Sequence, residues 1–188
     1  MIGGLDNYRK AIKNIKAIDA ELKLIIAGNH DVSLDPKWWA ENLDEDDDIP
    51  DDLDEPAKAK LLFKKEEANS VHLLEEGTHS FTLANGKAFS IYCSPYTPDF
   101  HGFAFSYRDE DRFTKGINPI KKNADIVMTH GPPLPPASFI AHDSWQLDLN
   151  SKGVHFGCPK LFSAVQRVQP KLHCFGHIHE GYGAQSVV

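Results

Sequence analysis

Two histidines separated by one residue follow a short apolar segment near the end of the sequence. The segment, Leu172–Phe175, is predicted to be a buried strand, and it runs directly into Gly176, His177, Ile178 and His179. Glycine lets the backbone turn and lets a ligand approach closely, and imidazoles one residue apart in an extended segment can reach neighbouring positions around a metal ion. Two surface histidines beside a turn would give the same pattern, so the pair alone leaves both interpretations open.

Two further apolar segments end in residues of types that bind metals. An aliphatic run over residues 22–27 is followed by Asn29 and His30, and a second run over residues 125–128 is followed by His130, each with a glycine at the corner. Strands of one sheet that end at the same edge bring such residues together although they are far apart in sequence. With the histidine pair, these endings predict a shared metal site built from three strand ends.

The donor atoms of these side chains indicate which metals the site would take. Imidazole nitrogens and an amide oxygen suit divalent Mn, Fe, Zn or Ni, and ligand type alone leaves a redox role open. The cysteines, Cys93, Cys158 and Cys174, show no CxxC spacing, so neither a disulfide framework nor a cysteine zinc site is predicted. Cys93 and Cys174 lie within apolar strands and are expected to be buried.

The elements that must position these residues alternate between helix and strand. Apolar residues over positions 8–18 repeat at helical spacing, with Asp6 as the expected N-cap, and this helix precedes the first strand. Asp35 followed by proline predicts the start of a second helix. Further helices are expected over residues 57–69 and from about Pro159.

The middle of the chain has a strand-like pattern. Short strands are expected over residues 71–74, 79–83 and 88–93. The dipeptide Asn85-Gly86 predicts a hairpin between the last two, and we expect all three to form an antiparallel meander. The aromatic-rich segment at residues 99–113 is interpreted as a loop packed over the core, with a pocket wall as the alternative.

Length and composition indicate one domain over residues 1–188. Hydrophobic residues make up 41% and charged residues 25% of the chain, as in ordinary globular proteins. The formal net charge of -7 is local, because nine acidic residues fall between Asp44 and Glu55. This region, at about residues 41–56, is expected to be a flexible, solvated insertion, with a regulatory or cation-attracting role as the alternative.

The sequence also bears on location and partners. No apolar run approaches the length of a membrane span, and the first residues lack the pattern of a signal peptide. We therefore expect a cytoplasmic protein with no membrane contact. The acidic cluster argues against nucleic-acid binding near that loop, and no specific nucleic-acid binding is predicted.

The three strand-end motifs closely resemble those of the calcineurin-like metallophosphoesterase family. They read Gly-Asn-His-Asp at residues 28–31, Thr-His-Gly-Pro-Pro at residues 129–133 and Gly-His-Ile-His at residues 176–179. Residues 91–98 and 167–183 are similar to the small metallophosphoesterase-domain proteins of fungi and animals. The resemblance implies an α/β (α+β) four-layer sandwich in which helices flank two mixed β-sheets, with a two-metal site that hydrolyses a small phosphate ester, a monoester or a diester.

The resemblance also implies roles for single residues. Asn29, His130 and His177 would bind the second metal ion, and His179 would complete the first. His30 would be catalytic, standing over the scissile phosphate to stabilise charge or to protonate the leaving oxygen. Asp31 would orient the His30 ring. A metal-activated hydroxide would attack phosphorus in line with the leaving group.

The family's Asp-x-His and Gly-Asp motifs have no counterpart in this sequence, so we expect the first strand or strands of the fold to be missing. The family pattern also continues past Gly183 with further strands, so we expect the last ones to be missing as well. Three hypotheses follow. The protein is a metallophosphoesterase whose sequence here is truncated, or it is a non-catalytic remnant that binds a partner and at most one metal ion. In the third, it is a mononuclear hydrolase in which Asp143, Asp148 or His155 supplies a substitute ligand.

Overall fold

The protein folds into helices packed on the outer faces of two β-sheets. The computed structural model describes residues 3–42, 52–99, 101–108, 112–113, 115, 119–143 and 145–186. The α-helices are α1 (Leu5–Lys16), α2 (Pro36–Asn42), α3 (Glu55–Glu66), α4 (Ala137–Asp143) and α5 (Pro159–Val168). The strands are β1 (Lys23–Ile25), β2 (Val71–Leu73), β3 (Gly77–Thr82), β4 (Ala88–Ser94), β5 (Thr97–Pro98), β6 (Ser106–Tyr107), β7 (Ile126–Thr129) and β8 (Leu172–Phe175). Short 3-10 helices are η1 (Val32–Leu34), η2 (Glu67–Asn69) and η3 (His179–Gly181).

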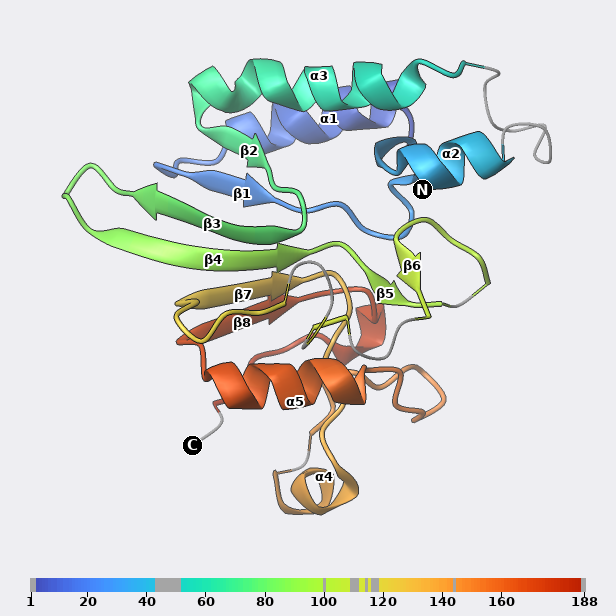
Figure 1. The fold of residues 1–188 in the computed structure, drawn as a ribbon, viewed down its shortest axis with the longest axis vertical. Helices are drawn as coiled ribbons and strands as arrows, with labels where there is room; N and C mark the ends of the chain where they lie inside the picture. Colours follow the sequence, from blue (N-terminus) through green and yellow to red (C-terminus); the bar gives the residue numbers. More distant parts are fainter. Residues whose placement is uncertain are drawn as a thin grey trace.

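The layers follow the predicted four-layer order of helix, sheet, sheet and helix. In Figure 1, α1 and α3 lie above the sheet of β1 and β2, the strands β3, β4, β7 and β8 lie beneath it, and α5 covers the lower side. The predicted α/β sandwich is therefore confirmed. The small pair β5 and β6 lies at the end of the sheets where β4 and β7 finish.

The strand pairing differs from the predicted meander. β3 and β4 form the expected antiparallel hairpin, with Gly86 in its turn at a φ of 80°, and β4, β7 and β8 continue the sheet in parallel. The strand over Val71–Leu73, however, pairs in parallel with β1. The meander is therefore wrong for β2. The first strand end also belongs to a different sheet from the other two, so the three endings meet across two sheets instead of along one.

Three groups of buried side chains hold the layers together. Tyr8 and Ile12 of α1 pack with Ala59 and Phe63 of α3 above the first sheet. Below the second sheet, α5 is packed against strand residues such as Val127. Between the sheets lies a third group that is centred on Leu74, Ile91 and Cys93, with Leu24, Ile26, Ile126 and Met128 partly buried beside it. Burying apolar area at about 25 cal/mol per Å² makes these contacts the main source of stability.

The last strand is less buried than its apolar sequence predicts. Leu172 keeps 52% of its surface exposed and Cys174 is also exposed, whereas Cys93 is fully buried as expected. β8 is the edge of its sheet, with β7 on one side only. A pattern of apolar residues predicts the strand, but it does not show whether a neighbour covers both of its faces.

Helix ends show one correct prediction and one error. The Asp35 carboxylate accepts hydrogen bonds from the N–H groups of Lys37 and Trp38, as an N-cap does. Asp6, in contrast, lies inside the first turn of α1, where it forms an ion pair with Arg9, and Gly4 occupies the N-cap position. An acidic residue stabilises either position because the helix dipole is positive at its N-terminus.

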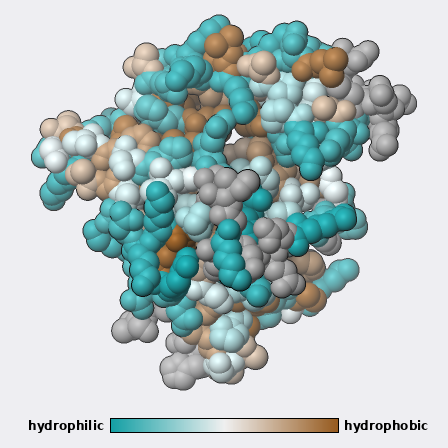
Figure 2. All heavy atoms as spheres, in the orientation of Figure 1, coloured by the Kyte–Doolittle hydropathy of each residue, from teal (hydrophilic) through white to brown (hydrophobic). Residues whose placement is uncertain are grey.

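The surface view in Figure 2 shows a face dominated by hydrophilic side chains, with hydrophobic ones visible chiefly near the α1–α3 layer and the strands beneath it. Most of the predicted acidic insertion, residues 43–51, lies outside the described residues. Among the helices that the structure describes, none combines the length and the apolar character needed to cross a membrane.

Candidate functional site

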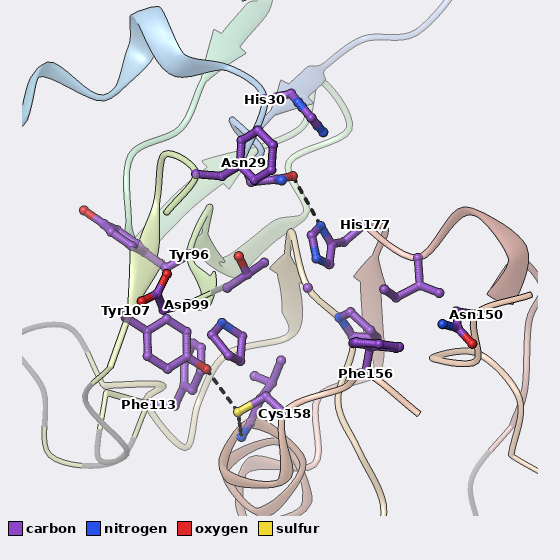
Figure 3. Close-up of a pocket in the computed structure, with 17 residues that line it drawn as sticks. Asn29, His30, Tyr96, Asp99, Tyr107, Phe113, Asn150, Phe156, Cys158 and His177 are labelled. Atoms are coloured by element: carbon purple, nitrogen blue, oxygen red, sulfur yellow. Dashed lines mark hydrogen bonds between the residues drawn. The ribbon is translucent and has the colours of Figure 1, made fainter. Parts of the chain in front are cut away.

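Three metal-type side chains converge at the ends of β1, β7 and β8. His130 Nε2 lies 2.8 Å from Asn29 Oδ1, and His177 Nδ1 lies 3.2 Å from both Asn29 Oδ1 and His130 Nε2. Asn29 follows β1, His130 follows β7 directly, and His177 lies two residues beyond β8. Figure 3 shows the contact between Asn29 and His177 at the rim of a cavity.

Hydrogen bonding alone cannot satisfy this triangle of atoms. The amide oxygen of Asn29 only accepts, so bonding to both rings requires a proton on both ring nitrogens. Those two nitrogens would then face each other at 3.2 Å as two donors. Two ligand atoms that each lie about 2.1 Å from one metal ion are about 3 Å apart when the ligand–metal–ligand angle is a right angle. The triangle therefore fits three ligands of a single divalent ion.

Burial keeps the two imidazoles neutral, as metal ligands must be. Burial, with smaller effects from His177, His30 and His179, lowers the pKa of His130 to about 3. The pKa of His177 is also lowered, by burial first and then by His179 and His30. Both rings are therefore neutral at neutral pH, and each has one unprotonated nitrogen that could bind a metal ion.

The backbone at the site is shaped for close approach. A methyl group at Gly28 would lie 2.6 to 2.9 Å from atoms of the His130 ring, so only glycine leaves the ring room. His177 has a φ of 71°, in the left-handed region that few residues other than glycine adopt. Such strain persists where the surroundings require one orientation of the side chain, and it is concentrated at functional sites.

Asp31 stabilises the turn that carries Asn29. Its carboxylate accepts a hydrogen bond of 2.7 Å from the N–H of Gly28, while its own N–H donates to the Gly28 carbonyl oxygen at 2.9 Å. Burial raises the pKa of this carboxyl group. His30 also lowers the pKa of this group electrostatically, and the role of Asp31 in orienting the His30 ring stays a prediction.

His30 and His179 are close enough to the triangle to lower the pKa values of its two histidines, but they do not belong to it. The exposed His30 ring packs on Phe103, with ring centroids 4.8 Å apart, and both residues line the cavity. His179 is exposed at the start of η3. Within the part of the chain that the structure describes, no group of three or more His, Cys, Asp or Glu side chains is placed to hold a metal ion. The metal role of His179 stays a prediction.

Two of the three candidate substitute ligands, Asp148 and His155, are engaged elsewhere. The fully buried Asp148 carboxylate accepts hydrogen bonds from Trp145 Nε1, from His155 Nδ1 and from the N–H of Gly157, at 2.8, 2.7 and 3.0 Å. These contacts close the loop between α4 and α5. The side chain of Asp143 lies outside the described residues. Asp148 and His155 therefore stabilise that loop.

A cavity of about 370 Å³ opens beside the triangle. Asn29, His30 and His177 lie at one end of it, and Phe113 and Cys158 lie near the start of α5 at the other (Figure 3). The aromatic segment thus serves both expected purposes, because Phe105 belongs to the core while other rings of the segment form a wall of the cavity.

Sequence reasoning missed the support behind His130. The buried Thr129 hydroxyl donates to the Gly131 carbonyl oxygen at 2.7 Å and lies 2.9 Å from His173 Nε2, which must then donate to it. These two hydrogen bonds of Thr129 hold the turn on both sides of His130. A threonine and a histidine on neighbouring strands were visible in the sequence, but nothing in it showed that β7 and β8 would pair with these two residues in reach.

Comparison with known proteins agrees with this geometry. Residues 3–181 match the model of the calcineurin-like phosphoesterase family. The chain is 36% identical over 171 residues to metallophosphoesterase domain-containing protein 1 of Homo sapiens and of Mus musculus, covering 88% of this chain and 47% of each relative. It is 33% identical over 187 residues to a probable rhamnogalacturonate lyase C of Emericella nidulans, covering 98% of this chain and 15% of that protein.

The chain thus spans about half the length, or less, of these curated relatives. The family model, in contrast, covers nearly all of this chain, including each of the three strand-end motifs. The chain belongs to the calcineurin-like phosphoesterase family.

Proposed function

We propose that this protein is a metal-dependent phosphoesterase that hydrolyses a phosphomonoester or phosphodiester of a small molecule. The observation that carries the proposal is the convergence of Asn29 Oδ1, His130 Nε2 and His177 Nδ1 within 2.8 to 3.2 Å of one another. A cavity large enough for a small ester opens beside these atoms. Membership of a family of phosphoesterases supports the reaction class.

Asn29, His130 and His177 would hold a divalent ion such as Mn, Fe, Zn or Ni. When bound, such an ion polarises a phosphoryl oxygen and lowers the pKa of water. The His30 ring lines the cavity beside the triangle, where it is exposed and packs on Phe103. From there it would donate a proton to the leaving oxygen or a hydrogen bond to the phosphoryl group. Asp31 would help indirectly, by holding the turn that places Asn29 and His30.

Metal content and hydrolysis test the proposal together. Purified protein supplied with Mn²⁺ is expected to bind the ion and to hydrolyse bis-p-nitrophenyl or p-nitrophenyl phosphate. His130→Ala should lose both properties. The matched control is His79→Ala, because His79 is a half-buried histidine on β3 whose ring lies 2.9 Å from the Glu75 carbonyl oxygen, outside the triangle and the cavity. A His130→Ala protein that folds, binds Mn²⁺ and hydrolyses these esters normally would refute the proposal.

A non-catalytic member of the family is the second candidate. The observation that favours it is that no group of three or more His, Cys, Asp or Glu side chains among the described residues is placed to hold a metal ion. A two-metal reaction needs more ligands than Asn29, His130 and His177 supply. On this alternative, the protein binds one ion through His130 but leaves both esters intact at saturating Mn²⁺. Hydrolysis that is lost in His130→Ala and kept in His79→Ala would exclude it.

A further inference from the structure

The cavity beside the metal-type residues has two ends that are lined by different residues. Asn29 and His177 mark the end where a phosphate group would bind, and the other end reaches the start of α5 at Cys158 and Leu161. A phosphate ester held at the first end would have to place its alcohol group in the remaining space. The walls of that space therefore bear on which esters fit.

Aromatic rings form part of these walls. Tyr96, Phe103, Tyr107, Phe113 and Phe156 all line the cavity. Their positions are fixed by other contacts, which preorganises the walls for a ligand. The Tyr107 hydroxyl donates to Cys158 Sγ at 3.0 Å, and its ring meets Phe113 edge-on at a centroid distance of 5.6 Å. The Arg112 guanidinium lies 3.4 Å from the centre of the Tyr96 ring.

The walls offer no positive charge to a second anionic group. Among the described residues that line the cavity there is no lysine or arginine, and the one carboxylate is Asp99. Arg108 holds that carboxylate at 2.7 Å, and this hydrogen bond lowers the pKa of Asp99, so it stays ionised. An additional carboxylate or phosphate on the ligand would meet rings and a negative charge, and burying an unpaired charge is costly.

We propose that this cavity binds the alcohol portion of the ester and selects uncharged aromatic groups over groups that carry a second anion. The inference rests on the proposed function, since it takes the phosphate to bind at Asn29, His130 and His177. The volume of about 370 Å³ lies at the small end of the range for ligand pockets, roughly 300 to 1,000 Å³, so one or two rings fit.

Equilibrium binding of phosphonates tests the inference without any turnover. The probes are methylphosphonate, phenylphosphonate and 4-carboxyphenylphosphonate, titrated by calorimetry into the protein supplied with Mn²⁺. Phenylphosphonate should bind at least about tenfold more tightly than methylphosphonate, because its ring leaves water for an aromatic cavity. The carboxylate of the third probe should remove most of that gain.

Two variants test where the phenyl ring of phenylphosphonate binds. Phe103→Ala and Phe156→Ala should each reduce the preference for phenylphosphonate over methylphosphonate by about threefold or more. Phe81→Ala is the matched control, because Phe81 is a partly buried phenylalanine on β3 that packs on Phe89 away from the cavity. Pro98→Lys would add a cation at an exposed lining position and should favour the carboxylated probe.

The outcomes separate this inference from the proposed function. If methylphosphonate and phenylphosphonate bind equally, and both lose affinity in His130→Ala, the phosphate end stands and the aromatic selection is wrong. If the ring improves binding but Phe103→Ala, Phe156→Ala and Phe81→Ala behave alike, the ring binds elsewhere and the inference is again wrong. If no phosphonate binds, both the proposed function and the inference fail.

Discussion

The Nε2 atom of His130 lies 2.8 Å from the amide oxygen of Asn29, although 101 positions separate the two residues in the sequence. The contact joins the end of β7 to the turn after β1, and so it bridges the two sheets. His177 reaches the same two atoms from the end of β8. The site is therefore a junction between sheets, and its geometry depends on how closely the turns approach.

Gly28→Ala should disrupt this approach. The added methyl group would lie 2.6 to 2.9 Å from the His130 ring, closer than carbon atoms pack, so the ring or the turn must move. We expect Mn²⁺ affinity to fall by about tenfold or more, since metal sites tolerate little displacement of a ligand. Calorimetric titration with Mn²⁺ measures the change.

Gly176→Ala provides the contrast within the same site. A methyl group there would meet only the His130 carbonyl oxygen, at 3.9 Å, which is an ordinary contact distance. Its backbone N–H, which donates to the same oxygen, is retained. Equal Mn²⁺ affinity in the two alanine variants would show that the clash at Gly28 does not control the position of His130.

Thr129→Val should destabilise the fold and loosen the site. Valine has the shape of threonine but lacks the hydroxyl that bonds to the Gly131 carbonyl oxygen and to His173 Nε2. Leaving these buried groups unpaired should lower the free energy of unfolding by about 2 kcal/mol or more. Denaturant unfolding measures it. Thr129→Ser keeps the hydroxyl and should lose only about 1 kcal/mol for the missing methyl group, so equal losses in the two variants would contradict the role of the hydroxyl.

His173 should make the fold less stable as the pH falls below neutral. Burial lowers its pKa from the ordinary value of 6.5 to about 4, so the folded protein keeps the ring neutral while the unfolded chain takes up a proton. Between about pH 6.5 and pH 4 the unfolded state therefore binds more protons. The resulting loss of stability reaches up to about 1.4 kcal/mol per pH unit.

His173→Gln isolates this contribution. Glutamine keeps an N–H group that can donate to Thr129 but does not titrate. In the presence of EDTA, the difference in unfolding free energy between pH 6.5 and pH 4.5 should be smaller in His173→Gln than in the unmodified protein. Parallel pH profiles for the two proteins would show that the His173 ring does not couple protonation to folding.

Local sequence patterns predicted single elements well and their partners less well. The hairpin at Asn85-Gly86 and the helix beginning at Pro159 follow from turn chemistry and periodicity, which act over a few residues. The pairing of β2 with β1 was missed, because an alternating pattern specifies a strand without specifying its neighbour. The exposure of Cys174 was missed for the same reason, since burial depends on what covers the sheet.

The candidate site was predicted in part for a related reason. Residue types at three strand ends indicated that Asn29, His130 and His177 would meet, and the structure brings them together. The support by Thr129 and His173 depends on the register between β7 and β8, where Val127 stands opposite His173. The aromatic cavity depends on how a loop with little regular structure folds. Neither feature has a local sequence signal.

Asp148→Asn should separate a structural role from a metal-binding one. The buried carboxylate accepts three hydrogen bonds, and the amide group would turn one acceptor into a donor facing another donor. We expect the free energy of unfolding to fall by about 2 to 4 kcal/mol. The fluorescence emission of Trp145 should also change, because its hydrogen bond to residue 148 is lost or weakened. Mn²⁺ stoichiometry should stay unchanged, because Asp148 is satisfied within its own loop.

Asp19→Asn, at an exposed position near the end of α1, should alter none of these properties. A folded Asp148→Asn protein that no longer binds Mn²⁺ would instead support a hydrolase in which Asp148 supplies a substitute ligand.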